Sequence, residues 1–122
     1  MSLAVGAMVA AAIDESYGID LQLKWPNDLY HDGQKIGGIL VESTSLTHQR
    51  QLSVIGLGLN ANMPQDLDVD IDQPWTDLRM ATGGMIERNS LASTVLNALI
   101  PGLEIFASNG FEPWRADWSI RD

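Results

Sequence analysis

The chain opens with an apolar helical segment, which is followed by a strand that alternates apolar with polar residues. Residues 4–16 are rich in alanine and end shortly before Gly18, a residue suited to the left-handed position after a helix. Residues 21–25 then place an apolar side chain at every second position, which is typical of a half-buried strand, and Pro26 stops this strand. The pattern therefore predicts a helix followed by a strand.

The middle of the chain continues the period-two pattern. His31-Asp32-Gly33 has the composition of a hairpin turn, and a second polar turn is expected over residues 45–49. These turns separate three further predicted strands, at residues 29–30, 35–44 and 51–63. Strands joined in sequence by short turns predict an antiparallel meander.

A loop dense in carboxylates follows the meander over residues 65–74 and ends at Trp75. Two interpretations of this loop are open, a mobile lid or a solvated connector. Thr76 is placed to cap a short helix that ends at Gly83-Gly84.

A longer helix is predicted after Asn89, its expected N-terminal cap. Apolar residues recur at helical spacing along it, at Leu91, Val95, Leu99, Leu103 and Phe106. Pro101 should kink this helix or split it in two. Trp114 and Trp118 lie four residues apart, which predicts one more helical segment near the end.

Composition and charge narrow the classes of partner. The chain has 122 residues, a net charge of −9 and no cysteine. Its own field repels phosphate backbones and anionic lipid, so we expect no nucleic-acid partner and no membrane association through this segment. The lack of cysteine fits a reducing, cytoplasmic location. We expect one domain, over residues 1–122.

The chain's only two lysines, Lys24 and Lys35, bracket a single turn. Lys24 and Asp28 flank Pro26 within that turn, an arrangement able to hold a phosphate oxygen with an ammonium group and a divalent cation with a carboxylate. The alternative is a plain surface ion pair between the two side chains, which would contribute little. The residues alone leave both interpretations open.

Two glycines and an amide share one face of a predicted strand. Gly56, Gly58 and Asn60 point to one side because side chains alternate along a strand, while the residues between them are aliphatic. Glycine weakens a strand interior, so two on one face indicate close approach of a ligand or, alternatively, a bulky neighbour that covers them.

Gly37-Gly38 on the preceding strand extends this bare surface. Lys35 and Gly38 would face opposite ways on an ideal strand, so contact of both with one ligand requires a bulge or main-chain contacts near Gly37-Gly38. The sequence therefore predicts an irregular strand over residues 35–39.

Three motifs together resemble the central part of the catalytic domain of biotin protein ligases, the biotin–[acetyl-CoA carboxylase] ligases. They are Lys24-Trp25-Pro26-Asn27-Asp28, Lys35-Ile36-Gly37-Gly38-Ile39-Leu40-Val41-Glu42 and Gly56-Leu57-Gly58-Leu59-Asn60. The resemblance implies that biotin and ATP form biotinyl-5′-adenylate with release of pyrophosphate. A lysine of the biotin carboxyl carrier protein then attacks the mixed anhydride.

The resemblance also implies roles for individual residues. Lys35 is similar to the catalytic lysine that contacts the biotin carboxylate and the adenylate, where it stabilises developing negative charge. The implied biotin-binding residues are Lys35, Gly38, Leu40, Gly56 and Gly58. The implied residues for ATP or the adenylate are Lys24, Asp28, Asn60 and Trp75, with Asp28 also a magnesium ligand and Trp75 stacked on adenine.

The fold implied is α+β, a mixed and mostly antiparallel sheet with helices on one face, as in the catalytic cores of class II aminoacyl-tRNA synthetases and biotin synthetases. Two parts of that family are not in the sequence: the Gly/Arg-rich loop segment that precedes the motifs, and the small C-terminal barrel. We therefore expect an incomplete domain that is inactive or nearly so alone. Exposed strand edges favour self-association. The resemblance implies a homodimer in which strands near Val41 to Thr47 align side by side.

Two other functions remain open from the sequence. One is lipoate or octanoyl transfer, since those proteins resemble biotin ligases in fold, although the intact Lys24–Asp28 motif favours biotin. The other is a noncatalytic interaction module that retains only the sheet.

Overall fold

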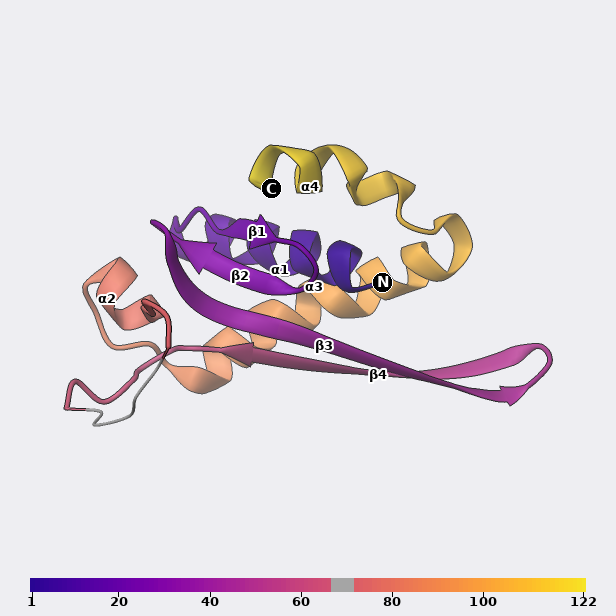
Figure 1. Ribbon diagram of the computed structural model, residues 1–122, viewed down its shortest axis with the longest axis horizontal. Helices are drawn as coiled ribbons and strands as arrows, with labels where there is room; N and C mark the ends of the chain where they lie inside the picture. The colour runs from indigo at the N-terminus through magenta and orange to yellow at the C-terminus, as the bar shows by residue number, and fades with distance from the viewer. Residues whose placement is uncertain (67–71) are drawn as a thin grey trace.

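A four-stranded antiparallel sheet forms the centre of the molecule (Figure 1). The computed structural model describes residues 1–66 and 72–122. Strand order follows chain order, so the predicted meander is confirmed. The strands are β1 (Gln22–Lys24), β2 (Asp28–His31), β3 (Gln34–Thr47) and β4 (Arg50–Leu59).

The helices pack mainly on one face of this sheet, as predicted (Figure 1). Two long helices lie behind the sheet and pack against each other, and a short C-terminal helix contacts the first of them and β1. The helical elements are α1 (Ser2–Tyr17), α2 (Leu78–Thr82), α3 (Arg88–Asn109), the 3-10 turn η1 (Glu112–Trp114) and α4 (Arg115–Arg121).

Several predicted boundaries differ from those observed. Gly18 ends α1 with a left-handed φ of 67°, as expected. β3 continues to Thr47 instead of residue 44, because the β-compatible serines and threonines there pair with β4. β4 ends at Leu59, since the Asn60 carbonyl accepts a hydrogen bond from the Leu78 amide at the start of α2 instead of from a strand.

The caps of α2 and α3 correct two predictions. Asp77, not Thr76, caps α2: its fully buried carboxylate accepts hydrogen bonds of 2.7 Å from the amides of Met80 and Met63. The two carboxylate oxygens of Asp77 give each of these amides its own acceptor.

Glu87, not Asn89, caps α3. Its carboxylate accepts hydrogen bonds from the Ser90 hydroxyl and from the backbone amides of Asn89 and Ser90, and these bonds lower its pKa from the ordinary value of 4.5. α3 then runs in one piece through Pro101, so the helix is not split.

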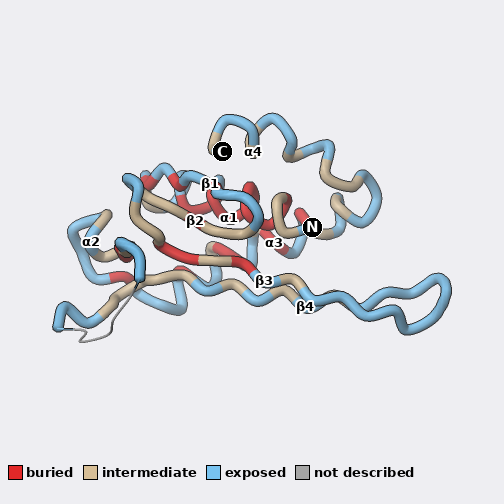
Figure 2. Tube along the Cα trace, viewed as in Figure 1, coloured by how far each residue is buried: buried red, intermediate tan, exposed pale blue. Residues whose placement is uncertain are grey.

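The burial pattern divides the molecule into a core and an arm (Figure 2). The core lies between α1, α3 and the near part of the sheet, and its fully buried members include Ile13, Leu29 and Ile36. Every residue from 42 to 52 is exposed. These residues form the far end of the β3–β4 hairpin, which projects beyond the helices as an arm (Figure 1).

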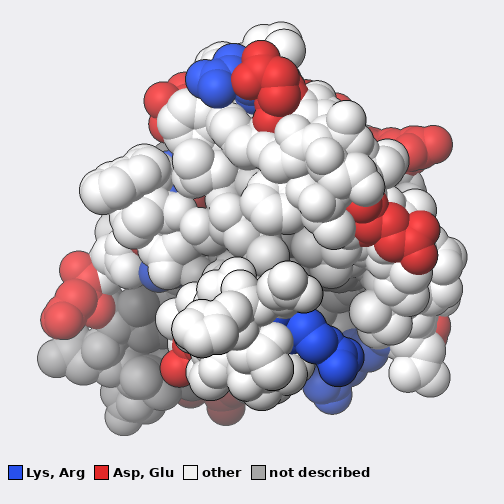
Figure 3. Space-filling view, turned by 90° about the vertical axis from the view of Figure 1, so that its right-hand side faces the viewer, with Lys and Arg blue, Asp and Glu red and all other residues white. Residues whose placement is uncertain are grey.

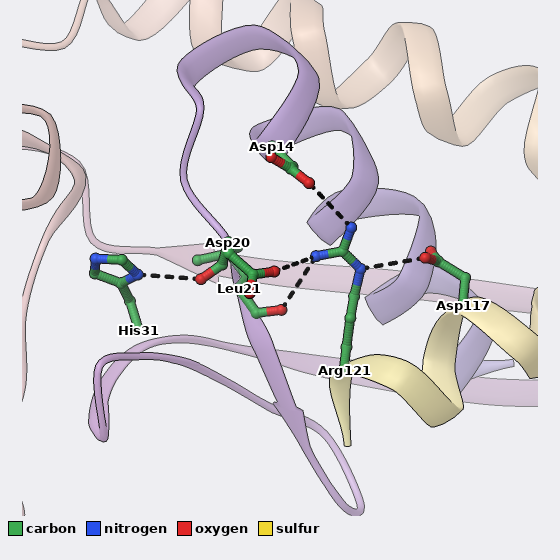
Figure 4. A network of polar contacts seen from close by, with 6 residues as sticks. All are labelled: Asp14, Asp20, Leu21, His31, Asp117 and Arg121. Carbon is green, nitrogen blue, oxygen red and sulfur yellow. Dashed lines mark hydrogen bonds and ion pairs between the residues drawn. The ribbon is translucent and has the colours of Figure 1, made fainter.

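An arginine network holds the C-terminal helix in place (Figure 4). The guanidinium of Arg121 on α4 lies 2.8 Å from the Asp20 carboxylate, and 3.3 Å from those of Asp14 and Asp117. It also donates to the Leu21 carbonyl. One side chain therefore ties α4 to the end of α1 and the start of β1.

Charge and hydropathy add two observations. Viewed from the end that carries the arm, the surface is largely uncharged, and its cationic side chains are few and scattered (Figure 3). Among the described residues, α3 is the one helix long and apolar enough to cross a membrane, by length and composition only. Much of its apolar surface faces the core side of β4.

Candidate active site

A β-bulge in β3 determines which side chains share a face. Leu29 of β2 pairs with Gly37 and Tyr30 pairs with Lys35, so Ile36 is an extra residue on β3. Ile36 is fully buried, and Gly37 also faces the core, against Leu29. Two successive residues therefore point to the core.

The bulge brings Lys35 onto the face that Gly38 and Leu40 occupy. Gly38 pairs with Gly58, and Leu40 with Gly56, in register across β3 and β4. The predicted irregularity over residues 35–39 is thus confirmed. It resolves the conflict between Lys35 and Gly38 that an ideal strand would impose.

Lys35 and Asp28 form an ion pair over this face. The Lys35 Nζ and the Asp28 Oδ1 are 2.9 Å apart, and both side chains are about 30% exposed (30% and 27%). A Cβ placed on Gly38 would lie 3.5 Å from that Asp28 oxygen and 3.9 Å from the Lys35 Cε. Asp28 therefore pairs with Lys35, and the surface ion pair considered for Lys24 and Asp28 is not formed.

Asn27 fixes the turn that presents Asp28. Its side-chain Nδ2 donates to the Ile39 carbonyl at 2.8 Å, and the Ile39 amide donates to the Asn27 carbonyl at the same distance. The Trp25–Pro26 peptide bond in this turn is cis. Two hydrogen bonds therefore hold the turn on β3, beside Gly38.

The glycines form the open floor of a first depression of about 440 Å³. A Cβ on Gly56 or Gly58 would meet only backbone and Leu40 atoms at 3.6 Å or more, so neither glycine is covered by a bulky neighbour. The depression is lined by Asn27, Asp28, Lys35, Gly38, Ile39, Leu40, Gly56, Leu57 and Gly58.

A second depression of about 410 Å³ adjoins the first and shares Lys35, Gly38 and Gly58 with it. Its other lining residues are Gly37, Asn60, Met63, Gln73 and Trp75. The Lys35 amide donates to the Pro74 carbonyl at 3.0 Å, and the Thr76 amide donates to the Lys35 carbonyl at 2.9 Å. Trp75 is therefore held beside Lys35 by backbone hydrogen bonds on both sides.

Known proteins match both the sequence and this geometry. The sequence model of the biotin/lipoate A/B protein ligase family matches residues 1–60. Over all its 122 residues the chain is 34% identical to the bifunctional ligase/repressor BirA of Escherichia coli. It is 28% identical to a solved biotin protein ligase from Aquifex aeolicus in complex with biotin and ATP, with a TM-score of 0.82 over 98% of this chain.

This chain belongs to the biotin/lipoate A/B protein ligase family. The resemblance to biotin protein ligases and the predicted α+β fold are both confirmed. The chain spans 38% of the E. coli protein and 49% of the A. aeolicus chain. In this family member, one face of the sheet carries Lys35, Asp28 and the glycine floor together.

Asn60 and Lys24, the remaining residues singled out for the adenylate, differ in position. Asn60 lines the second depression, and its Nδ2 donates to the Thr76 carbonyl at 3.1 Å. Lys24 lies on the same face of the sheet but lines neither depression. Its Nζ lies 5.3 Å from the centroid of the Tyr30 ring. The two lysines that bracket the turn are thus not brought together.

No local pattern in the sequence assigned a role at the site to Asn27 and Gln73, which line the depressions, or to Tyr30, which contacts Gln73. Asn27 lay within a motif but was assigned only to a turn. Tyr30 and Gln73 are 43 residues apart and meet through a hydrogen bond. Their contact depends on tertiary structure, which no local pattern reveals.

Two questions about the carboxylates have different answers. Residues 67–71 lie outside the described residues, so the choice between a lid and a connector for residues 65–74 is not decided. Across residues 1–66 and 72–122, no three His, Asp or Glu side chains group to hold a metal ion. Asp28 therefore belongs to no such group among these residues, and its carboxylate is paired with Lys35.

Proposed function

We propose that this chain is the central part of the catalytic domain of a biotin–protein ligase. The observation that carries the proposal is the bulge, which places Lys35 beside a glycine floor that no side chain of the described chain covers. Two depressions that share Lys35, Gly38 and Gly58 suit a ligand with two joined parts. Biotinyl-5′-adenylate is such a ligand, because an acyl phosphate joins its biotin part to its nucleotide part.

In this proposal the first depression holds biotin and the second holds the nucleotide. Gly38, Gly56 and Gly58 let the biotin rings lie against bare backbone, with Leu40 beside them. Trp75 stacks on adenine and Asn60 hydrogen-bonds the adenylate. Lys35 stands at the boundary, where the reacting carboxyl group would sit.

The reaction proceeds in two steps. A carboxylate oxygen of biotin attacks the α-phosphorus of ATP, and the bond from that phosphorus to pyrophosphate breaks. A lysine amine of biotin carboxyl carrier protein, as in acetyl-CoA carboxylase, then attacks the carbonyl carbon, and AMP leaves. Lys35 stabilises the negative charge that develops in both steps, while Asp28 would hold Mg²⁺ against the ATP phosphates and Lys24 would attract them.

We further propose that this polypeptide alone is inactive or nearly so, in a cytoplasmic parent protein. The net charge of −9 disfavours ATP attraction. Detection of ATP-dependent biotinylation of carrier protein by this chain would contradict that proposal. Inactivity together with adenylate binding would support it.

Self-association is proposed on separate grounds. β4 is the last strand of the described sheet, and its core-facing residues and α3 border an open apolar groove of about 610 Å³. Such edges and patches favour pairing with another chain. Light scattering on two double variants would show which surface pairs. One variant carries Leu96→Glu and Ile100→Glu in the groove, and the other carries Leu46→Glu and Leu52→Glu on the arm. A strictly monomeric wild type at all concentrations would refute the homodimer.

Isothermal titration tests the ligand class. We expect biotinyl-5′-adenylate to bind this chain more tightly than lipoyl-adenylate, and Lys35→Ala to weaken the binding. Tighter binding of lipoyl-adenylate would favour lipoate transfer. Binding of neither ligand would favour a noncatalytic module and refute the proposal.

A further inference from the structure

Tyr30 contacts both Lys24 and Gln73, two residues of the proposed nucleotide half of the site. Its side chain stands on the site face of β2, since the adjacent Leu29 is fully buried in the core. Its hydroxyl donates to the Gln73 Oε1 at 3.1 Å. Its ring lies under the Lys24 ammonium, 5.3 Å from centroid to Nζ.

Gln73 links Tyr30 to the tryptophan of the second depression. Gln73 and Trp75 both line that depression. Trp75 lies between Pro74 and Thr76, whose backbone groups hydrogen-bond to Lys35. Lys35 is in turn the register partner of Tyr30. The Tyr30 hydroxyl and the backbone of its partner Lys35 therefore hold the segment that carries Trp75 at two points.

The Lys24 side chain must be held in position by a neighbour if it is to act at the site, because it lies outside both depressions. Lys24 is exposed, and a long flexible ammonium side chain loses conformational freedom when it is held in one place. A ring face within about 6 Å attracts an ammonium group. The ring of Tyr30 thus keeps the cation on the site face of the sheet.

We propose that Tyr30 is a positioning residue for the nucleotide, which sets Lys24 and the Gln73–Trp75 segment on either side of the adenylate. The proposal rests on the proposed function and goes beyond it, because it assigns the spacing of the nucleotide subsite to a residue that touches neither biotin nor the reacting atoms. The Tyr30 hydroxyl holds the segment that carries Trp75, and the Tyr30 ring holds the Lys24 ammonium group.

Two variants separate these contributions. Tyr30→Phe removes the hydrogen bond to Gln73 but keeps the ring under Lys24, so it should weaken biotinyl-5′-adenylate binding by about three- to tenfold and change biotin binding by less than about twofold. Tyr30→Leu removes both contacts and should weaken adenylate binding further. Tyr17→Phe, at the other tyrosine, is the matched control and should change neither affinity.

A double-mutant cycle and hydrogen exchange complete the test. Gln73→Ala should reproduce Tyr30→Phe, and the double variant should bind no more weakly than either single variant. Without any ligand, Tyr30→Phe should speed exchange of the Thr76 amide while the Gly18 amide, at the far end of α1, stays unchanged.

The outcomes separate this proposal from the proposed function. Suppose that the wild-type chain binds the adenylate. The role of Tyr30, but not the proposed function, would then be refuted if Tyr30→Phe bound the adenylate equally well, or if this variant lost affinity for biotin and the adenylate in parallel. Unchanged Thr76 exchange in Tyr30→Phe would also refute it. Wild-type chain that binds neither biotin nor the adenylate would refute the proposed function, and the Tyr30 proposal with it.

Discussion

Gly37 and Gly38 are adjacent in β3 but face opposite sides of the sheet, and the space around them differs. On the core side, a Cβ at Gly37 would collide with the Gly58 carbonyl oxygen and crowd Leu59 and Leu29. On the site side, a Cβ at Gly38 would make only ordinary contacts of 3.5 Å or more, and the same holds for Gly56 and Gly58.

The space around a Cβ on each face distinguishes a glycine that the fold requires from a glycine that a ligand would require. Gly37 is needed because two backbones approach closely inside the protein. Nothing in the described chain demands glycine at Gly38, Gly56 or Gly58, whose φ angles are not in the left-handed region. Under the proposed function, their small size leaves room for a ligand on the site face.

The largest expected effect is on ligand binding through the site face. Gly58→Val should weaken biotinyl-5′-adenylate binding by at least about 100-fold, because the added methyl groups occupy the ligand's space. Unfolding free energy should stay equal or rise, since valine favours strands more than glycine does. Titration calorimetry and urea unfolding measure the two quantities. Loss of stability with unchanged affinity would reverse the assignment.

The core face gives the opposite result. Gly37→Ala should lower the unfolding free energy by about 1–3 kcal/mol, because the added methyl group forces β3 and β4 apart. Urea denaturation of this variant and of Gly38→Ala gives a matched pair one residue apart. Equal stability of the two variants would show that the faces do not differ.

Within the site face, Trp75→Ala distinguishes the two depressions. Stacking on a base contributes about 1–3 kcal/mol, so this variant should weaken ATP and adenylate binding much more than biotin binding. Competition titrations with biotin, ATP and the adenylate measure each loss. Equal losses would place Trp75 outside the nucleotide half.

The smallest expected effect is at the start of α3, far from both glycine faces. Hydrogen bonds from Ser90 and Asn89 lower the folded-state pKa of Glu87 below 4.5, so its contribution to stability is complete above pH 4.5 and is lost as the pH falls through the lowered pKa. Wild type should therefore exceed Glu87→Gln in stability at neutral pH, and the difference should vanish in acid. A difference that grows in acid would contradict this sign.

The sequence predicted the face of Gly56 and Gly58, but it did not predict that Gly37 faces the core instead of extending the bare surface. Period-two alternation is a backbone property, so it gave the aliphatic face and the bare face of β4 correctly. The conflict between Lys35 and Gly38 predicted an irregular strand, and the bulge at Ile36 is that irregularity. These inferences succeeded because they depended only on neighbours in the chain.

Other features depended on distant contacts and were missed or wrong. Asp77 replaced Thr76 as the cap of α2 because it also receives the Met63 amide, 14 residues away. Lys24 was considered as an ion-pair partner of Asp28, but Asp28 pairs with Lys35 and Lys24 lies against Tyr30 on the next strand. Pairing partners of this kind follow from the packed sheet, which local patterns do not specify.

The central claim is that the bare face of β3 and β4 receives the biotinyl-adenylate. The most direct test is a titration of biotinyl-5′-adenylate followed by the backbone amide NMR signals of the 11 glycines. Signals of Gly38, Gly56 and Gly58 should move to new positions at saturation, while those of Gly18 and Gly110, in turns after α1 and α3, should stay. Site-face signals that do not move, while the turn glycines do, would contradict the account.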